Sequence, residues 1–239
     1  MTISRTVDYL IEGNEHEGLI VQVPSATSAA PTVLIFHAWE GRTSATDKFA
    51  RRITDLGLNA FATDLYGKGV VGGTPAECQA LMNPLLGDRA RLRQILLEVV
   101  DVAAAQPEVD AKRMTAIGFC FGGLCVLDLA RAGAPLHGVA SFHGLYTPPG
   151  LPTVRPLNTK IIAYHGWDDP LVLPKDVTGF GQEFTEAGAD WQLHAFGGAS
   201  HAFMDEGANM PEIGIAYNAV VADRAWRGLE LFLKEALGA

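Results

Sequence analysis

The strongest constraint on the fold of this chain is an alternation of short apolar runs with stretches of helical periodicity. The apolar runs have the length of strands and cover residues 32–39, 59–66, 113–120, 137–144, 160–167 and 190–197. Most of them are apolar at nearly every position, which is typical of strands covered on both faces. Because helical patterns separate these runs, we expect right-handed βαβ crossovers and a mainly parallel sheet with helices on both faces.

An alternating segment at residues 17–24 precedes these runs and predicts an antiparallel strand, paired with residues 7–12, for a sheet of about eight strands. Apolar positions with helical spacing predict a helix through Phe49 and Leu56 that Gly57 ends, and another through Leu92 and Val102 that Asp88 caps. A last helix is predicted around residues 221–233. No repeat, low-complexity tract or linker divides the chain, so we expect residues 1–239 to form one domain.

Charge and composition argue against several classes of protein. The formal net charge is −9, so binding to nucleic acid would work against electrostatic repulsion. No apolar run reaches the ~20 residues that span a bilayer, and the N-terminal residues lack the apolar core of a secretory signal. The cysteines are Cys78, Cys120 and Cys125, an odd count without a C-x-x-C pair. We therefore expect a reduced cytoplasmic protein.

The most specific local pattern is Gly-Phe-Cys-Phe-Gly-Gly at residues 118–123, between an apolar strand and a helical pattern. It matches the nucleophile elbow G-x-S-x-G, whose glycines permit a strained turn that exposes the central side chain at a helix N-terminus. We therefore expect an α/β-hydrolase fold with Cys120 as nucleophile and the Phe121 N–H directed at an oxyanion. The alternative is a glycine-rich turn around a buried, inert cysteine. Cys125 is expected to pack inward, and Cys78 lies in a Gly/Pro-rich connection without a visible base.

A cysteine nucleophile requires a histidine base that a third group orients, in the chain order nucleophile, acid, histidine. That order excludes His16 and His37, and His143 and His165 precede the available acids. His137 begins a strand, at the wrong edge of the sheet, and His194 lies inside one. His201 remains, in a loop of small residues after the last predicted strand. The acid is Asp168 or Asp169, at the end of the preceding strand.

With these residues in place, the chain resembles the dienelactone hydrolase family over residues 18 to 237. The resemblance rests on the cysteine elbow, on H-A-W-E-G at residues 37–41, on D-L-Y-G at 64–67, and on the elements H-G-W-D-D-P and S-H-A-F. The family pattern G-x-x-D-x-x-V, read from Gly166, selects Asp169 over Asp168 as the acid.

The resemblance also implies roles for other residues. Glu40 would hold the thiol in its neutral form until substrate arrives, and the Gly41 N–H would be the second oxyanion donor; the alternative for Glu40 is a carboxylate that caps the helix starting near Thr43. Trp39, Tyr66 and Lys68 are expected to contact substrate.

Two departures bear on specificity, because enzymes acting on dienelactone are expected to hold its carboxylate with two arginines. This chain has Lys68 and Asp205 at the corresponding positions, and an aspartate would repel a carboxylate.

The sequence thus predicts a hydrolase that cleaves a small carboxylic ester or lactone through a thioester acyl-enzyme. We expect no cofactor and no metal, because no His, Cys and Asp cluster has ligand spacing. The expected partner is a small-molecule substrate, with no nucleic acid and no membrane, and the protein is expected to be a monomer or homodimer. An acyltransferase or thioesterase, a redox-sensing thiol protein, and a non-catalytic binding protein on the same fold are the alternatives.

Overall fold

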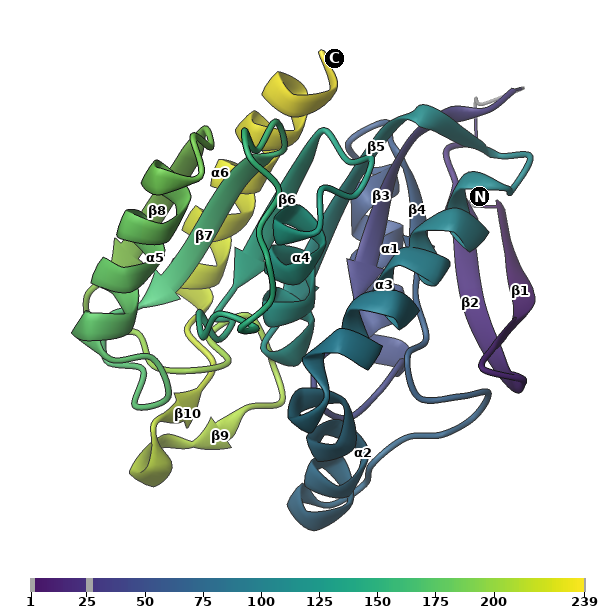
Figure 1. Ribbon diagram of the computed structural model, residues 1–239. Coiled ribbons are helices and arrows are strands. Elements are labelled where there is room, and N and C mark those ends of the chain that lie inside the picture. Colours follow the sequence, from purple (N-terminus) through teal and green to yellow (C-terminus); the bar gives the residue numbers. More distant parts are fainter. Residues whose placement is uncertain (1–2, 25–27, 239) are drawn as a thin grey trace.

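A twisted sheet runs through the centre of the computed structural model, which describes residues 3–24 and 28–238 (Figure 1). Its eight strands lie in the order β1-β2-β4-β3-β5-β6-β7-β8. Their bounds are β1 Ile3–Ile11, β2 Asn14–Gln22, β3 Ala30–Phe36, β4 Asn59–Ala62, β5 Val109–Phe119, β6 Gly138–Phe142, β7 Lys160–Gly166 and β8 Trp191–Phe196. The pairs from β4 to β8 are parallel, whereas β2 pairs antiparallel with both β1 and β4. The predicted sheet, with its antiparallel N-terminal pair, is confirmed.

The β1–β2 hairpin begins earlier than the sequence predicts. Val7 pairs with Gly18, and Ile11 pairs with Asn14 across a two-residue turn. Glu12 was expected in the strand but lies in the turn with Gly13, at φ values of 52° and 80°. Turns with two such residues have the twist that a short hairpin requires.

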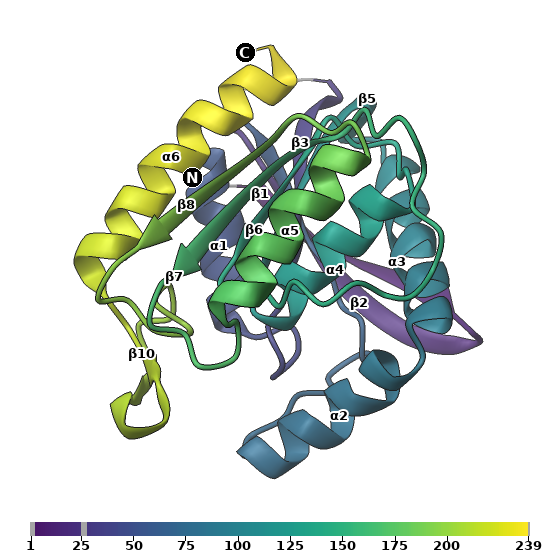
Figure 2. The ribbon, with the colours of Figure 1, turned by 60° about the vertical axis from the view of Figure 1, so that its left-hand side comes forward.

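Helices cover both faces of the sheet, as predicted, and Figures 1 and 2 show the two layers. α1 (Ser44–Thr54) and α6 (Ala219–Leu237) pack on one face. α3 (Arg89–Ala104), α4 (Phe121–Arg131) and α5 (Pro174–Glu186) pack on the other. The sheet therefore separates two apolar cores, one on each side of it.

Side-chain caps explain where several helices begin. Asp88 caps α3 as predicted, and its carboxylate accepts the Arg91 N–H at 3.0 Å. Thr43 caps α1, and Asn218 caps α6. Gly57, in contrast, is not the C-cap of α1: the helix ends at Thr54 with Asp55 as its cap, and Gly57 closes the following turn at φ 81°.

Two elements at the carboxyl end of the parallel strands were not predicted from the sequence. α2 (Pro75–Gly87) and the small pair β9 (Asn209–Met210) and β10 (Ile215–Ala216) lie at the end of the sheet to which the parallel arrows point (Figure 1). A short 3-10 helix, η1 (Pro211–Ile213), joins β9 to β10. Cys78, expected in an irregular connection, is a buried residue of α2.

Candidate active site

The turn between β5 and α4 places Cys120 at the carboxyl end of the sheet. Cys120 has a positive φ of 52°, a strained conformation for a residue with a side chain, and its N–H donates to the Phe142 oxygen at 3.0 Å. Phe121 is the first residue of α4, so its N–H has no acceptor within the helix. The thiol is partly exposed, whereas Cys78 and Cys125 are buried. The structure thus places Cys120 as an elbow requires, and Cys125 packs inward as expected.

The glycines beside Cys120 are required by close backbone contacts. A Cβ on Gly118 would lie 2.0 Å from the Gly122 oxygen, and one on Gly122 would lie 2.2 Å from the Phe36 oxygen. Any larger residue at either position would force the backbone to move. The pattern that indicated an elbow in the sequence therefore has a steric cause.

Asp169 and His201 form a buried pair beside the elbow. Nδ1 of His201 lies 2.8 Å from Oδ2 of Asp169, and Oδ1 of Asp169 accepts the Leu171 N–H at 2.8 Å. Asp168 is exposed. The Asp169 carboxylate thus holds the imidazole with its Nδ1 protonated and leaves Nε2 as the basic nitrogen. Nε2 is buried and has no hydrogen-bond partner among the described residues.

The returning chain at β10 holds the backbone of His201 in place. The His201 N–H donates to the Gly214 oxygen at 2.9 Å, and the His201 oxygen accepts the Ala216 N–H at 3.0 Å. The segment that forms β9 and β10, residues 209–216, thus fixes the loop that carries the imidazole of His201.

The electrostatic environment of His201 favours its protonated form. Burial lowers its pKa, but the hydrogen bond to Asp169 and the contact with Cys120, which carries a negative charge as a thiolate, outweigh burial and raise the pKa to about 10. Because the thiol is one of the causes of the shift, Cys120 and His201 are electrostatically coupled. A proton moved from the thiol to the imidazole would be stabilised by the Asp169 carboxylate.

The loop after β3 is held by buried polar contacts. The two ring nitrogens of His37 lie 2.7 Å from the Ala38 oxygen and 3.1 Å from the Leu65 N–H, which assigns the proton to Nδ1. Tyr66 donates to the Trp39 oxygen at 3.0 Å. His37, which chain order excludes as the base, therefore positions this loop. The residues in these contacts belong to the H-A-W-E-G and D-L-Y-G elements, at residues 37–41 and 64–67.

Gly41 and Glu40 lie in the same loop. The Gly41 N–H already contacts the Ala38 oxygen at 3.3 Å, a long hydrogen bond that an oxyanion would have to replace. Glu40 is half-buried; burial raises its pKa, and the Asp205 carboxylate raises it further. Thr43 rather than Glu40 caps α1, so the capping role considered for Glu40 is not observed.

Cys120, His201 and Glu40 face a cavity of about 1050 Å³. Its lining includes Trp39, Glu40, Cys120, His143, His201 and Asp205. α2 contributes Met82, and the β9–β10 excursion contributes Met210 and Ile215. The cavity therefore brings the nucleophile and base candidates together under a largely apolar cover.

Lys68 and Tyr66 are not among the residues that line this cavity. Nζ of Lys68 lies 2.8 Å from Asp8 and 3.6 Å from Glu17, on the outside of the β1–β2 hairpin. Lys68 is thus paired outside the cavity lining, and its contact with substrate stays a prediction. Tyr66 holds the loop after β3 through its hydrogen bond to the Trp39 oxygen, and its ring stacks on Phe121 with ring centroids 6.1 Å apart.

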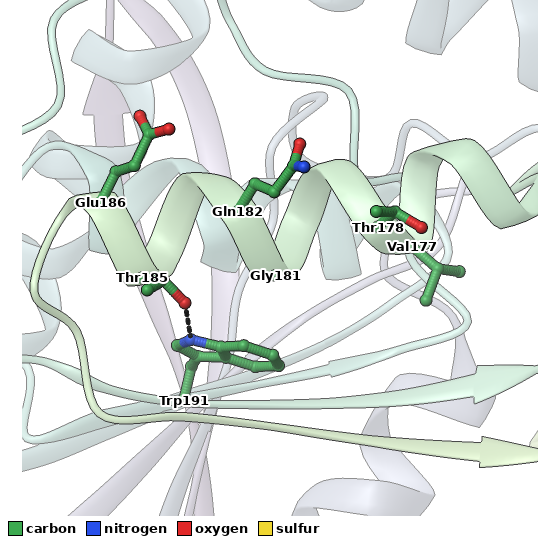
Figure 3. A pocket seen from close by; sticks show the side chains of 7 residues that line it. All are labelled: Val177, Thr178, Gly181, Gln182, Thr185, Glu186 and Trp191. Atoms are coloured by element: carbon green, nitrogen blue, oxygen red, sulfur yellow. Dashed lines mark hydrogen bonds between the residues drawn. The ribbon is translucent and has the colours of Figure 1, made fainter.

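A shallower depression of about 530 Å³ lies between α5 and the start of β8. In it Trp191 donates from Nε1 to Thr185 Oγ1 at 3.0 Å (Figure 3). Its other lining side chains include no nucleophile paired with a base. Across residues 3–24 and 28–238, no group of three or more His, Cys, Asp or Glu side chains is arranged to hold a metal, and no helix is long and apolar enough to cross a membrane.

The parallel sheet, the strained cysteine elbow and the Asp169–His201 pair define an α/β-hydrolase. The family model of the dienelactone hydrolase family matches residues 17–237, and the chain belongs to that family. The resemblance seen in the sequence is confirmed, and with it the assignment to a family of ester- and lactone-hydrolysing enzymes.

Three similar proteins illustrate the relationship. A dienelactone hydrolase-like promiscuous phosphotriesterase, P91 from metagenomic libraries, is 33% identical with a TM-score of 0.90, covering 98% of each chain. A structure titled m3DLH is 32% identical with a TM-score of 0.93, covering 99% of each chain. A relative from Aquifex aeolicus, provisionally named carboxymethylenebutenolidase, is 28% identical over 74% of this chain and 78% of its own.

Proposed function

We propose that this protein hydrolyses an uncharged carboxylic ester or lactone with Cys120 as nucleophile, His201 as general base and Asp169 as the group that orients the imidazole. The observation that carries the proposal is the buried 2.8 Å contact between Asp169 and His201 in the cavity into which the strained Cys120 turn projects. A nucleophile and a base that face one cavity, with an orienting acid bonded to the base, are the parts that acyl transfer requires.

The chemistry runs in two half-reactions. Nε2 of His201 takes the thiol proton as Sγ of Cys120 attacks the carbonyl carbon, and the oxyanion accepts the Phe121 N–H. The tetrahedral intermediate collapses to a thioester as His201 returns that proton to the leaving oxygen. Water then gives a proton to His201 and attacks the thioester, and the acid leaves as the thiol regains a proton.

Glu40 has a role before substrate binds. A carboxylate in the same cavity as the thiol disfavours the thiolate by charge repulsion. The raised pKa of Glu40, caused first by burial and then by Asp205, indicates that the cavity tolerates further negative charge poorly. We therefore propose that Glu40 keeps Cys120 protonated until substrate displaces the carboxylate.

The nature of the cavity supports the substrate class. Its volume of about 1050 Å³ and its apolar lining side chains accommodate a substrate larger than an acetate ester. Lys68 is held by Asp8 and Glu17, so it does not supply a cation for a free carboxylate. The provisional name of the Aquifex aeolicus relative is that of a lactone-cleaving enzyme, which favours esters and lactones among acyl substrates.

The decisive experiment compares wild type with Cys120→Ala on p-nitrophenyl esters, with mass spectrometry of the stalled protein. We expect Cys120→Ala to abolish turnover and an acyl adduct to appear on Cys120 in the wild type. Cys78→Ala and Cys125→Ala are the matched controls, because both thiols are buried and neither is among the residues that line the cavity with His201. Retained turnover in Cys120→Ala would exclude the mechanism.

Further assays of the same variants separate the other candidate functions. A non-catalytic binding protein would bind esters without turnover in any variant. An acyltransferase would give methyl ester when methanol is added, and a thioesterase would prefer thioesters of the same acyl group. A redox-sensing thiol would be oxidised by peroxide at Cys120 and would show no ester turnover.

Hydrolysis of phosphotriesters is a second candidate activity. The observation that favours it is the likeness over 98% of both chains, at 33% identity and a TM-score of 0.90, to a protein titled a promiscuous phosphotriesterase. Turnover of paraoxon by wild type, lost in Cys120→Ala, would establish it; a single stoichiometric burst of p-nitrophenol would show inactivation instead.

A further inference from the structure

His143 is a cavity residue to which the mechanism above gives no role. It directly follows β6, and β6 lies between β5, which ends at the Cys120 turn, and β7, which leads to Asp169. The His143 N–H donates to the Tyr164 oxygen at 2.9 Å, and the Cys120 N–H donates to the residue before it, Phe142. The backbone of His143 is thus tied to the strands of both the nucleophile and the acid.

The side chain of His143 is buried and lacks hydrogen-bond partners. It is 2% exposed and lines the cavity together with Cys120 and His201. Neither Nδ1 nor Nε2 has a hydrogen-bond partner among the described residues. A neutral imidazole carries one donor and one acceptor, and nearly all buried polar groups in native proteins are paired. An imidazole with both nitrogens unpaired beside a nucleophile therefore points to a ligand group.

The surroundings of His143 hold it in a fixed place. Its ring centroid lies 5.2 Å from those of both His201 and Phe203, in edge-on arrangements, and 6.2 Å from that of Phe119. Its φ is 38°, an unfavourable value for a residue with a Cβ. Strained residues of this kind cluster where a site needs a side chain in one orientation.

The charge state of His143 suits it to hydrogen bonding rather than to proton transfer. Burial lowers its pKa well below the ordinary value, and the neighbouring His201 lowers it further. The ring therefore stays neutral when His201 is protonated, does not repel it, and does not compete with it as a base.

The strand order decides which part of a substrate His143 faces. β5 lies between β3 and β6. The Gly41 N–H, the second oxyanion donor that the family resemblance implies, follows β3 on one side of Cys120, and His143 lies on the other side, with β7 and β8 beyond it. A carbonyl oxygen bound on the β3 side leaves the departing oxygen on the side of His143 and His201.

We propose that the imidazole of His143 hydrogen-bonds the leaving oxygen of the substrate, and then the water that takes its place in the second half-reaction. The inference rests on the proposed function. His143 transfers no proton: His201 delivers the proton to the leaving oxygen, and the hydrogen bond from His143 stabilises the negative charge that develops there as the carbon–oxygen bond breaks.

The test is a series of aryl acetates whose leaving groups range from p-nitrophenol to p-methoxyphenol, assayed with wild type, His143→Phe and His143→Gln. Without the hydrogen bond, poor leaving groups should suffer most. We expect His143→Phe to lower kcat/KM at least tenfold more for p-methoxyphenyl acetate than for p-nitrophenyl acetate. His143→Gln keeps a donor and an acceptor, and we expect it to restore most of the difference.

His16→Phe is the matched control, because His16 is also buried but lies on β2 and does not line the cavity. It should leave the dependence on the leaving group unchanged. If His143→Phe does not fold, as judged by circular dichroism, His143→Leu supplies the same comparison.

Two outcomes would overturn the inference. An equal loss for every leaving group would make His143 a packing residue, and no loss at all would remove it from the reaction. The proposed function fails separately: in that case wild type would show no turnover, or Cys120→Ala would retain it.

Discussion

Two adjacent aspartates at the end of β7 have different environments. Asp169 is buried against His201, whereas Asp168 is exposed. The pattern G-x-x-D, read from the sequence, favours the residue that the structure places in the pair. At the scale of single residues, Asp169 is therefore the group whose loss should matter.

We predict that Asp169→Asn lowers kcat by about 10²–10⁴-fold, because the amide stabilises the wrong tautomer of His201. Asp168→Asn is the matched control and should cost less than about threefold, since its exposed carboxylate contacts neither the base nor the nucleophile. The measurement is kcat on a p-nitrophenyl ester. A larger loss in Asp168→Asn would reassign the acid.

The raised pKa of His201 predicts a pH dependence of stability. Its ordinary value is 6.5, and in the folded protein it is about 10. Between these values His201 holds a proton in the folded state that it has released in the unfolded state, so its contribution to the free energy of unfolding should fall as pH rises from about 6.5 to 10. The contribution is complete below the ordinary pKa, and its slope is at most about 1.4 kcal/mol per pH unit.

Urea unfolding of wild type and Asp169→Asn across this range measures the effect. The buried thiols of Cys78 and Cys125 also have raised pKa values, from burial, and add a slope of the same sign in both proteins. The difference between the two proteins therefore isolates the Asp169–His201 pair. Parallel curves would contradict the prediction.

At the scale of elements, the β5–α4 turn is the most constrained point in the fold. We predict that Gly122→Ala destabilises the protein by at least about 2 kcal/mol, because the new Cβ would lie 2.2 Å from the backbone oxygen of Phe36. The displaced turn should also lower kcat. Chemical denaturation and a p-nitrophenyl ester assay measure the two effects.

Gly179→Ala is the control for this substitution. Gly179 lies within α5, and its added Cβ would have no described neighbour within 4 Å. Replacing a helical glycine should stabilise the protein by about 0.5–1 kcal/mol. Equal effects of the two substitutions would show that the close contact does not constrain the turn.

The central elements were predictable because their apolar patterns are strong. Strands β3, β4, β6 and β7 are buried at nearly every position, so their sequences are nearly all apolar and their place in the βαβ order follows. The same order pointed to Cys120, to His201 and to Asp168 or Asp169 as candidates, since the ends of parallel strands meet at one edge, and the family pattern G-x-x-D then favoured Asp169.

α2 escaped notice because only Cys78 and Leu85 of its residues are buried, which leaves no apolar period to detect. A capping box nevertheless marks its start: Glu77 accepts the Thr74 N–H at 2.9 Å, and Pro75 stands at the first turn. β9 and β10 have two residues each, too few for any period. Their place depends on pairing with His201, which is a tertiary contact.

The position of Lys68 depends on tertiary contacts in the same way. Its position after D-L-Y-G suggested a cation near substrate, but the β1–β2 hairpin places Asp8 and Glu17 beside it. Partners that are distant in the sequence thus decided where its charge lies. The cytoplasmic location and the monomeric or dimeric state stay predictions.

At the scale of the whole molecule, net charge and cavity charge have the same sign. The chain carries a formal charge of −9, and the cavity lining contains Glu40, Asp205 and Glu206 against Lys48 and Arg52. Lys48 lies 3.7 Å from Glu206, and Arg52 stacks over the Trp226 ring at 3.8 Å. Both cations are therefore already engaged, and a substrate carboxylate would meet an acidic rim.

We predict that wild type prefers the methyl ester of dienelactone over the free acid in kcat/KM. Asp205 lines the cavity and is exposed, so Asp205→Asn should improve the free acid by roughly two- to fivefold relative to the ester, the factor expected from about 0.5–1 kcal/mol. Asp190 is an exposed aspartate paired with Lys160 outside the cavity, so Asp190→Asn should leave the ratio unchanged.

The preference for the ester should also shrink as salt rises, because screening weakens repulsion between exposed charges. A tenfold preference for the free acid that Asp205→Asn does not alter would mean that another cation holds the carboxylate, and dienelactone itself would then be the better substrate.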